Sequence, residues 1–165
     1  MTIPELPVPP RGVSVMTFNF DGSFLATVDQ LRPNMVWIWS IETTPRLASA
    51  LVHEYAVRHV IWHPQKTECL ITTANGAFAA VRRWSSNESP AIVRVPVPRS
   101  EAGKYDVRWS ASEQNGNAVF WFGTGEDYVL GYLEAQAGGL RFNALYSVSS
   151  KAQPGSSVSG IGRYI

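Results

Sequence analysis

The sequence has little of what catalysis, metal binding or strong electrostatic binding requires. Of its 165 residues one is a cysteine, three are histidines and 16% are charged, for a formal net charge of +1. One cysteine cannot form an internal disulfide, which favours a reducing compartment. The charge balance gives no reason to expect nucleic acid or an anionic membrane as partner. No apolar run approaches the roughly 20 residues of a membrane helix, and no signal-peptide pattern is present, so we expect a cytoplasmic protein.

The few reactive side chains are not arranged as an active site. The histidines, His53, His59 and His63, have only Cys69 and one glutamate nearby as further zinc ligands, and their spacing is not that of a zinc site. Cys69 lies in an apolar stretch without a neighbouring base. The segment Gly123–Tyr128, "GTGEDY", lacks the third glycine and the helix of a dinucleotide-binding motif. We therefore expect no enzymatic activity, no metal and no cofactor.

Aromatic and turn-forming residues are plentiful instead. The chain contains six Trp, six Tyr and seven Phe, together with 13 Gly and 11 Pro, which is typical of β-strands joined by many turns. Pairs such as Asn115-Gly116 are typical of β-hairpin turns. In "PNMVWIWS", Pro33 to Ser40, both alternating sets of side chains are apolar. Such a strand is expected to be covered on both faces.

Three stretches of the chain align with one another, beginning at Val13, Val57 and Tyr105. Aromatic residues end the first and third strands of each unit and recur about every 45 residues, the size of one propeller blade. Those of the first strand are Phe18, Trp62 and Trp109, and those of the third are Trp39, Trp84 and Tyr132. The sequence predicts strands at 13–18, 24–28, 35–40 and 47–52, then 57–62, 68–73, 77–84 and 91–95, then 104–109, 117–122, 127–133 and 140–148.

We therefore predict an all-β fold of three four-stranded propeller blades. Their boundaries are about 12–53, 54–98 and 99–148, with a Pro-rich linker at 1–11 and a flexible tail at 149–165. A closed propeller needs about four to eight blades. The chain is thus expected to be part of a larger propeller or to assemble with another copy through its open blade edges. The alternative is a rearranged β-sandwich, whose aromatics could stack on sugar rings.

The repeats resemble the WD-repeat (WD40-type) family. "FNFDGSFLAT" is similar to the family's turn between the first and second strands, and "VWIWS" to its third strand, with Ser40 in place of the usual Asp. The stretch Gly12 to Ile41, with "LAT" and "PNMVWIWSI", is most similar to the late blades of the spindle-pole and centrosomal WD repeat protein eight family. The match covers about 30 residues closely and extends loosely to about residue 133.

This resemblance implies a structural network and a function. In the family, a His, a loop Asp, a strand Ser or Thr and the Trp form a buried hydrogen-bond network. The matching positions of the second unit here are His53, Thr72 or Thr73, and Trp84. Trp39 is the matching tryptophan of the first unit. The implied function is a non-enzymatic adaptor that anchors microtubule minus ends at the spindle pole. The implied partners are a coiled-coil spindle-pole protein and a kinesin-14 motor. The alternative is a WD-repeat adaptor of another multiprotein complex.

Several cations are the candidate partner-binding residues, because arginine is enriched at interaction hot spots. Arg82 and Arg83 occupy places that hold Trp37 and Ile38 in the first unit. The predicted partner-binding residues are Arg58, His59, Arg82, Arg83 and Arg108, which with Arg94 and Arg99 would form a mildly basic face.

Overall fold

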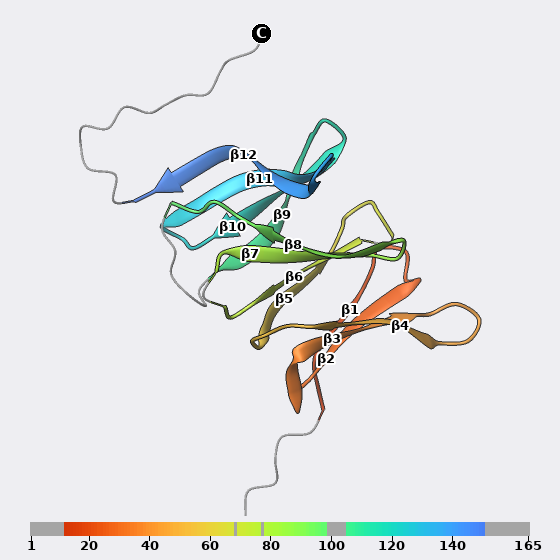
Figure 1. Cartoon of the computed structure of the whole chain (residues 1–165). Coiled ribbons are helices and arrows are strands. Elements are labelled where there is room, and N and C mark those ends of the chain that lie inside the picture. Colours follow the sequence, from red (N-terminus) through yellow and green to blue (C-terminus); the bar gives the residue numbers. More distant parts are fainter. Residues whose placement is uncertain (1–11, 68, 77, 99–104, 151–165) are drawn as a thin grey trace, which may run out of the picture.

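A computed structural model describes residues 12–67, 69–76, 78–98 and 105–150, and the regular structure in this part is entirely β (Figure 1). The twelve strands form three antiparallel four-stranded sheets. Sheet 1 comprises β1 (Val13–Phe18), β2 (Phe24–Asp29), β3 (Arg32–Ser40) and β4 (Arg46–Val52). Sheet 2 comprises β5 (Val57–Trp62), β6 (Cys69–Ala74), β7 (Ala80–Ser85) and β8 (Glu88–Arg94). Sheet 3 comprises β9 (Asp106–Gln114), β10 (Asn117–Gly123), β11 (Asp127–Gln136) and β12 (Gly139–Ser149).

The prediction of an all-β fold with three four-stranded blades is confirmed. In every sheet the strands lie side by side in chain order, as in a propeller blade rather than a sandwich. Asn115 and Gly116 both have positive φ, 52° and 72°, as the turn between β9 and β10 requires. β12 runs through Ser149, one residue beyond its expected end. The expected linker 1–11 and residues 151–165 of the expected tail lie outside the described residues.

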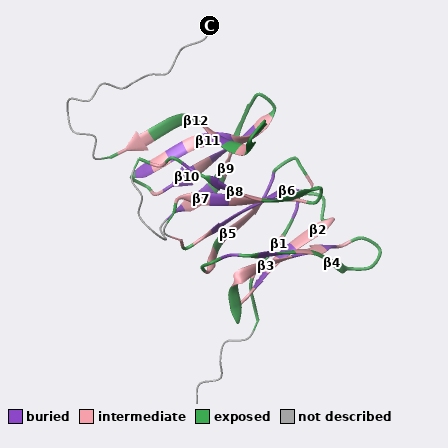
Figure 2. Cartoon of the chain, in the orientation of Figure 1, coloured by how far each residue is buried: buried purple, intermediate pink, exposed green. Residues whose placement is uncertain are grey.

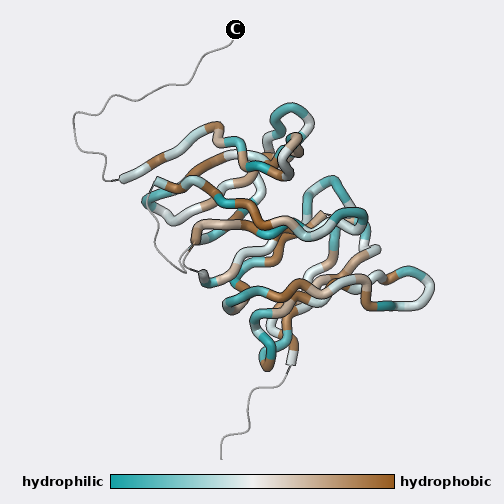
Figure 3. Tube along the Cα trace, in the orientation of Figure 1, coloured by the Kyte–Doolittle hydropathy of each residue, from teal (hydrophilic) through white to brown (hydrophobic). Residues whose placement is uncertain are grey.

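The sheets are stacked, with apolar side chains between them. One cluster between sheets 1 and 2 includes Val36, Ile38 and Leu70; another between sheets 2 and 3 includes Ile71 and Phe120. Buried residues lie along the strands, and exposed residues lie in the connections and on the outer strands, such as β12 (Figure 2). The hairpin ends are largely hydrophilic, whereas apolar segments lie within the strands (Figure 3). β1, β5 and β9 are the first strands of their sheets. β5 contacts β1 on one side and β9 on the other, as inner strands of neighbouring blades do.

The two faces of "PNMVWIWS" differ in the structure. Val36 and Ile38 are fully buried against sheet 2, whereas Trp37 and Trp39 are only partly buried on the opposite face. On the open face of sheet 1, some side chains are exposed whose counterparts in sheet 2 are buried. Phe18, the partner of Leu25, is 53% exposed, whereas Trp62 at the matching position of sheet 2 is 8% exposed. The expected closure by a further blade or a second copy would cover this face, and stays a prediction.

Strand register corrects one part of the repeat. Leu25 lies opposite Trp39 and Leu70 opposite Trp84, but the matching residue of sheet 3, Phe120, lies opposite Gly131 rather than Tyr132. A β-carbon at Gly131 would lie 2.4 Å from the ring of Phe142 and 2.3 Å from the Asn143 carbonyl oxygen. Phe142, on β12, thus fills the space that a third-strand tryptophan fills in sheet 2. Its ring packs edge-on against Phe120, with centroids 5.4 Å apart.

Candidate functional site

Two of the predicted partner-binding residues form an ion-pair cluster between sheets. Arg58 and His59 on β5 both meet Asp106 on β9: Arg58 Nη2 lies 2.9 Å and His59 Nε2 lies 3.0 Å from Asp106 Oδ1. The Arg58 guanidinium, together with His59, lowers the pKa of the Asp106 carboxyl below its ordinary range. All three side chains are about one-third exposed. The cluster joins the inner strands of sheets 2 and 3, so its first role is structural.

Replacing Asp106 with Asn should have a small effect on stability. Exposed ion pairs contribute up to about 1 kcal/mol, so we expect the free energy of unfolding in urea to fall by no more than about that amount. Leu145→Ala, on exposed β12, is the control. A loss of several kcal/mol from Asp106→Asn would show that the cluster holds the sheets together more strongly than its exposure implies.

The other predicted arginines do not join this cluster. Arg82 and Arg83 are neighbours on β7 and point to opposite faces of sheet 2. Arg82 donates to the Val52 carbonyl oxygen on β4, whereas Arg83 pairs with Glu88 on the face toward sheet 3. Arg108 is exposed on β9 of sheet 3. Arg82 and Arg83 therefore do not share one face of the sheet, because side chains alternate along a strand. Their role in partner binding stays a prediction, and Arg99 lies outside the described residues.

An exposed apolar surface with arginines lies at the β8 side of sheet 2. Three large side chains are well exposed there: Tyr55 (45%), Phe78 (62%) and Ile92 (64%). Together with Arg82 they line one cleft of about 170 Å³. Arg94 lies over the Phe78 ring, 4.9 Å from its centroid, in a cation–π contact. We call these five residues the outer-edge patch.

Strand pairing explains why the outer-edge patch is continuous. On β7 and β8, Ala80 pairs with Arg94 and Arg82 with Ile92, so all four side chains share one face of the sheet. The connection from β4 to β5 adds Tyr55, whose ring would lie 3.5 Å from a β-carbon at Gly76 in the turn before β7. Sequence reasoning missed Tyr55, Phe78 and Ile92. For Tyr55 and Phe78 the signal was an aromatic residue in a connection, whereas Ile92 lies within β8 and gave none.

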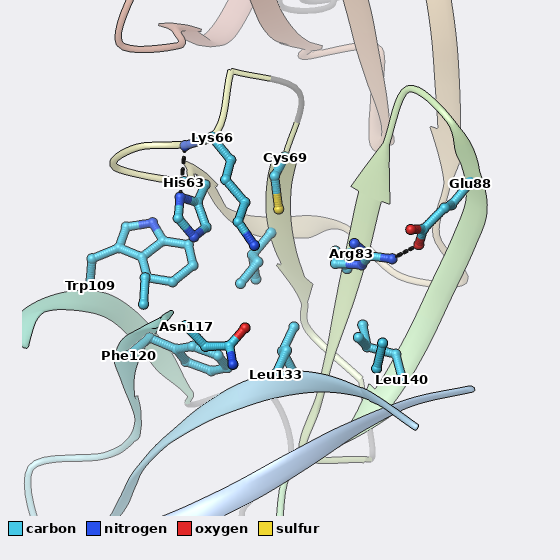
Figure 4. A pocket seen from close by; sticks show the side chains of 13 residues that line it. His63, Lys66, Cys69, Arg83, Glu88, Trp109, Asn117, Phe120, Leu133 and Leu140 are labelled. Atoms are coloured by element: carbon cyan, nitrogen blue, oxygen red, sulfur yellow. Dashed lines mark hydrogen bonds and ion pairs between the residues drawn. The ribbon is translucent and has the colours of Figure 1, made fainter. Parts of the chain in front are cut away.

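Arg83 faces a cavity of about 210 Å³ between sheets 2 and 3 (Figure 4). Lys66, exposed on the connection after β5, points into it from the rim, and Asn117 and Trp109 line it from sheet 3. Arg83 is paired with Glu88 through Nη2. Two buried N–H groups, Arg83 Nε and Trp109 Nε1, have no hydrogen-bond partner among the described residues.

The remaining polar groups of the cavity wall are neutral. Gln65 and Lys66 donate backbone N–H bonds of 3.1 and 2.9 Å to His63 Nδ1, which places the ring proton on Nε2. Burial, with a contribution from the Lys66 charge, lowers the pKa of His63 to about 4. Burial raises the pKa of the Cys69 thiol, so this cysteine is protonated at neutral pH and a poor nucleophile.

One contact of the hydrogen-bond network that the resemblance implies is present. His53 Nε2 lies 3.0 Å from Thr72 Oγ1, and both residues are buried. In sheet 1, Trp39 Nε1 donates to Thr27 Oγ1 at 3.1 Å. Trp84 packs against Phe24 and Trp62, with ring centroids 5.6 and 6.1 Å away. Of the two predicted threonines, Thr72 is therefore the one that meets the histidine.

The described residues contain no cluster of three or more His, Cys, Asp or Glu side chains that could hold a metal ion. Within the same part of the chain, no helix is long and apolar enough to cross a membrane.

Comparison with known proteins identifies the fold. No protein-family profile matches the chain. It is 36% identical over 77 residues to WD repeat-containing protein WRAP73 of Mus musculus, covering 47% of this chain and 16% of that protein. It is 24% identical over 131 residues to the uncharacterized WD repeat-containing protein C32H8.09 of Schizosaccharomyces pombe, covering 73% and 26%.

Solved structures agree with the sequence matches. The Saccharomyces cerevisiae Sqt1 structure superposes with a TM-score of 0.60 at 14% identity, covering 83% of this chain and 36% of that one. The fold is a partial WD40-type propeller. The complex of KlAtg21 with the coiled coil of AgAtg16 gives a TM-score of 0.59 at 11% identity, covering 84% and 42%. The chain spans about a sixth and a quarter of the length of the two curated relatives.

Proposed function

We propose that this chain belongs to a non-enzymatic adaptor that binds protein partners through the outer-edge patch. The observation that carries the proposal is the patch itself: Tyr55, Phe78 and Ile92 are exposed together beside Arg82 and Arg94. Contiguous exposed apolar residues mark interaction sites. Tyrosine and arginine are enriched among the residues that dominate binding energy.

The chemistry of the patch fits an amphipathic helix with acidic flanks. Phe78 and Ile92 would accept an apolar stripe, as grooves that bind helices do. The Arg94 guanidinium over the Phe78 ring would meet carboxylates at the edge of that stripe. Coiled-coil proteins supply such helices, with apolar seams flanked by charged positions. The solved complex of KlAtg21 with a coiled coil, on a similar fold, supports this kind of partner.

More specifically, we propose an adaptor of the spindle pole or centrosome. Its partners would be a coiled-coil spindle-pole protein and a kinesin-14 motor, and its location the cytoskeleton. The support is the resemblance of Gly12 to Ile41 to that family. The alternative is an adaptor of another complex, which the similarity to WD-repeat proteins in general supports equally.

The test is direct binding between the full-length protein and a purified coiled-coil spindle-pole protein. Phe78→Ala and Ile92→Ala should each weaken binding about 30-fold, the effect of losing a hot-spot residue of about 2 kcal/mol. Phe20→Ala and Leu145→Ala remove side chains that are 60% and 48% exposed outside the patch, and should leave affinity unchanged.

Two results would contradict these proposals separately. Normal binding by both patch variants would rule out the patch as the binding surface. Absence of the tagged full-length protein from spindle poles, with binding only to unrelated complexes, would rule out the spindle-pole adaptor and favour the alternative.

A further inference from the structure

At the cavity between sheets 2 and 3, a charged side chain, Arg83, stands at a position that an apolar core residue occupies in sheet 1. Ile71 lies opposite Arg83 on β6 and β7, as Ala26 lies opposite Ile38 on β2 and β3. Ile38 is fully buried in an apolar cluster. The same place in sheet 2 carries a guanidinium whose side chain is 18% exposed. An apolar residue therefore suits the backbone at this position, and a buried charge is costly unless it is paired.

Glu88 compensates only part of the positive charge. It pairs with Arg83 Nη2, and its own side chain is 59% exposed. Arg83 Nε and Trp109 Nε1 are both buried without a hydrogen-bond partner among the described residues. Lys66 adds a second cation that points into the same space (Figure 4). The described lining thus carries two cationic side chains, Arg83 and Lys66, against one carboxylate, that of Glu88.

The opposite wall of the cavity is apolar. Phe120, Leu133 and Leu140 from sheet 3 face Ile71 from sheet 2. The volume of about 210 Å³ is larger than the roughly 150 Å³ of an engineered protein cavity that binds benzene. The cavity therefore combines a cationic, donor-rich side with an apolar side of single-ring size.

We propose that this cavity binds a compact organic monoanion, with a carboxylate on a single ring or a short branched chain. The carboxylate would lie between Arg83 and Lys66, beside the indole ring of Trp109 (Figure 4). The apolar body would pack against Phe120, Leu133 and Leu140. This site is separate from the outer-edge patch, and its existence does not depend on the proposed adaptor function.

Benzoate is a suitable probe, and benzamide is its neutral counterpart of nearly the same shape. Each would be titrated into the whole chain and followed by calorimetry and by the fluorescence of Trp109, compared with a Trp109→Phe chain. We expect benzoate to bind at least about tenfold more tightly than benzamide, since hydrogen bonds to charged groups contribute about 1.5–3 kcal/mol. Equal binding of the two probes, or no binding of benzoate, would overturn the proposal.

Arg83→Met tests the residue that carries the inference. Because Ile38 occupies the matching place in sheet 1, the apolar variant should fold, and circular dichroism would check this. We expect it to weaken benzoate binding at least about tenfold, while Arg141→Met, exposed on β12 and outside the cavity, changes it less than twofold. Lys66→Met at the rim is a second variant, expected to weaken binding several-fold. Unchanged affinity in folded Arg83→Met would refute the site.

Discussion

Acidification from pH 7 to pH 4 is expected to destabilise the chain by up to about 3 kcal/mol for each of two histidines, His53 and His63. Burial lowers the pKa of both to about 4, with Arg82 adding to the effect at His53 and Lys66 at His63. In the unfolded chain an imidazole has a pKa near 6.5. The unfolded state therefore takes up protons first as the pH falls, and each histidine's contribution, complete above about pH 6.5, is lost toward pH 4.

The hydrogen bonds give a structural reason for the acid sensitivity. His63 Nδ1 accepts two backbone N–H bonds, and a proton on that atom would replace both. Protonated His53 would be a buried cation close to Arg82. Protonation therefore opposes the folded arrangement at both sites.

Urea unfolding at several pH values would measure this effect. His53→Gln and His63→Gln should each remove about half of the stability lost between pH 6.5 and pH 4, whatever their effect at neutral pH. The double variant should be nearly independent of pH in this range. NMR titration of the folded chain should place both imidazole transitions near pH 4; a transition near pH 6.5 at either residue would contradict the prediction for that site.

Gly131→Ala is expected to lower the stability of the chain by about 3 kcal/mol. The added β-carbon would lie 2.3 Å from the carbonyl oxygen of Asn143 and 2.4 Å from the ring of Phe142. The first contact is with the backbone of a paired strand, so β12 would have to move away from β11. For a chain of this size the melting temperature should fall by about 6–12 °C.

Gly138→Ala is the matched control for this change. Gly138 lies in the turn between β11 and β12, and a β-carbon there meets nothing within 4 Å. Its melting temperature should stay close to that of the unchanged chain, within about 0.5 kcal/mol of stability. Similar melting temperatures for the two variants would show that Phe142 does not occupy the place of the missing tryptophan.

Periodicity was sufficient to locate the blades because each strand pairs with its neighbour in the sequence. The alternation in "PNMVWIWS" and the aromatic spacing from Phe18 to Trp62 identified strands that the structure contains. The third-strand aromatic of sheet 3 could not be found in this way. Its place is filled from a different strand, by Phe142 over Gly131. The sequence of β11 alone does not indicate that an aromatic residue of β12 takes this place.

The proposed binding surfaces were harder to predict, because they depend on which sheet lies beside each face. Arg82 and Arg83 are adjacent in the sequence, but one reaches sheet 1 and the other faces sheet 3. Tyr55, Phe78 and Ile92 come from two connections and an outer strand, and only the folded arrangement brings them together. Single apolar residues near turns are common, so each alone gave no reason to expect an interaction surface.

The order of strands within the sheets has a consequence for synthesis on the ribosome. Among the residues that the structure describes, every hydrogen-bonded strand pair joins elements that are consecutive in the chain. Within this part, no sheet must wait for a distant segment to complete its backbone hydrogen bonds. Such short-range pairing costs little loop-closure entropy and favours rapid folding. Sheet 1 can therefore form while residues of sheet 2 are still being translated, and each completed sheet offers its apolar face as a template for the next.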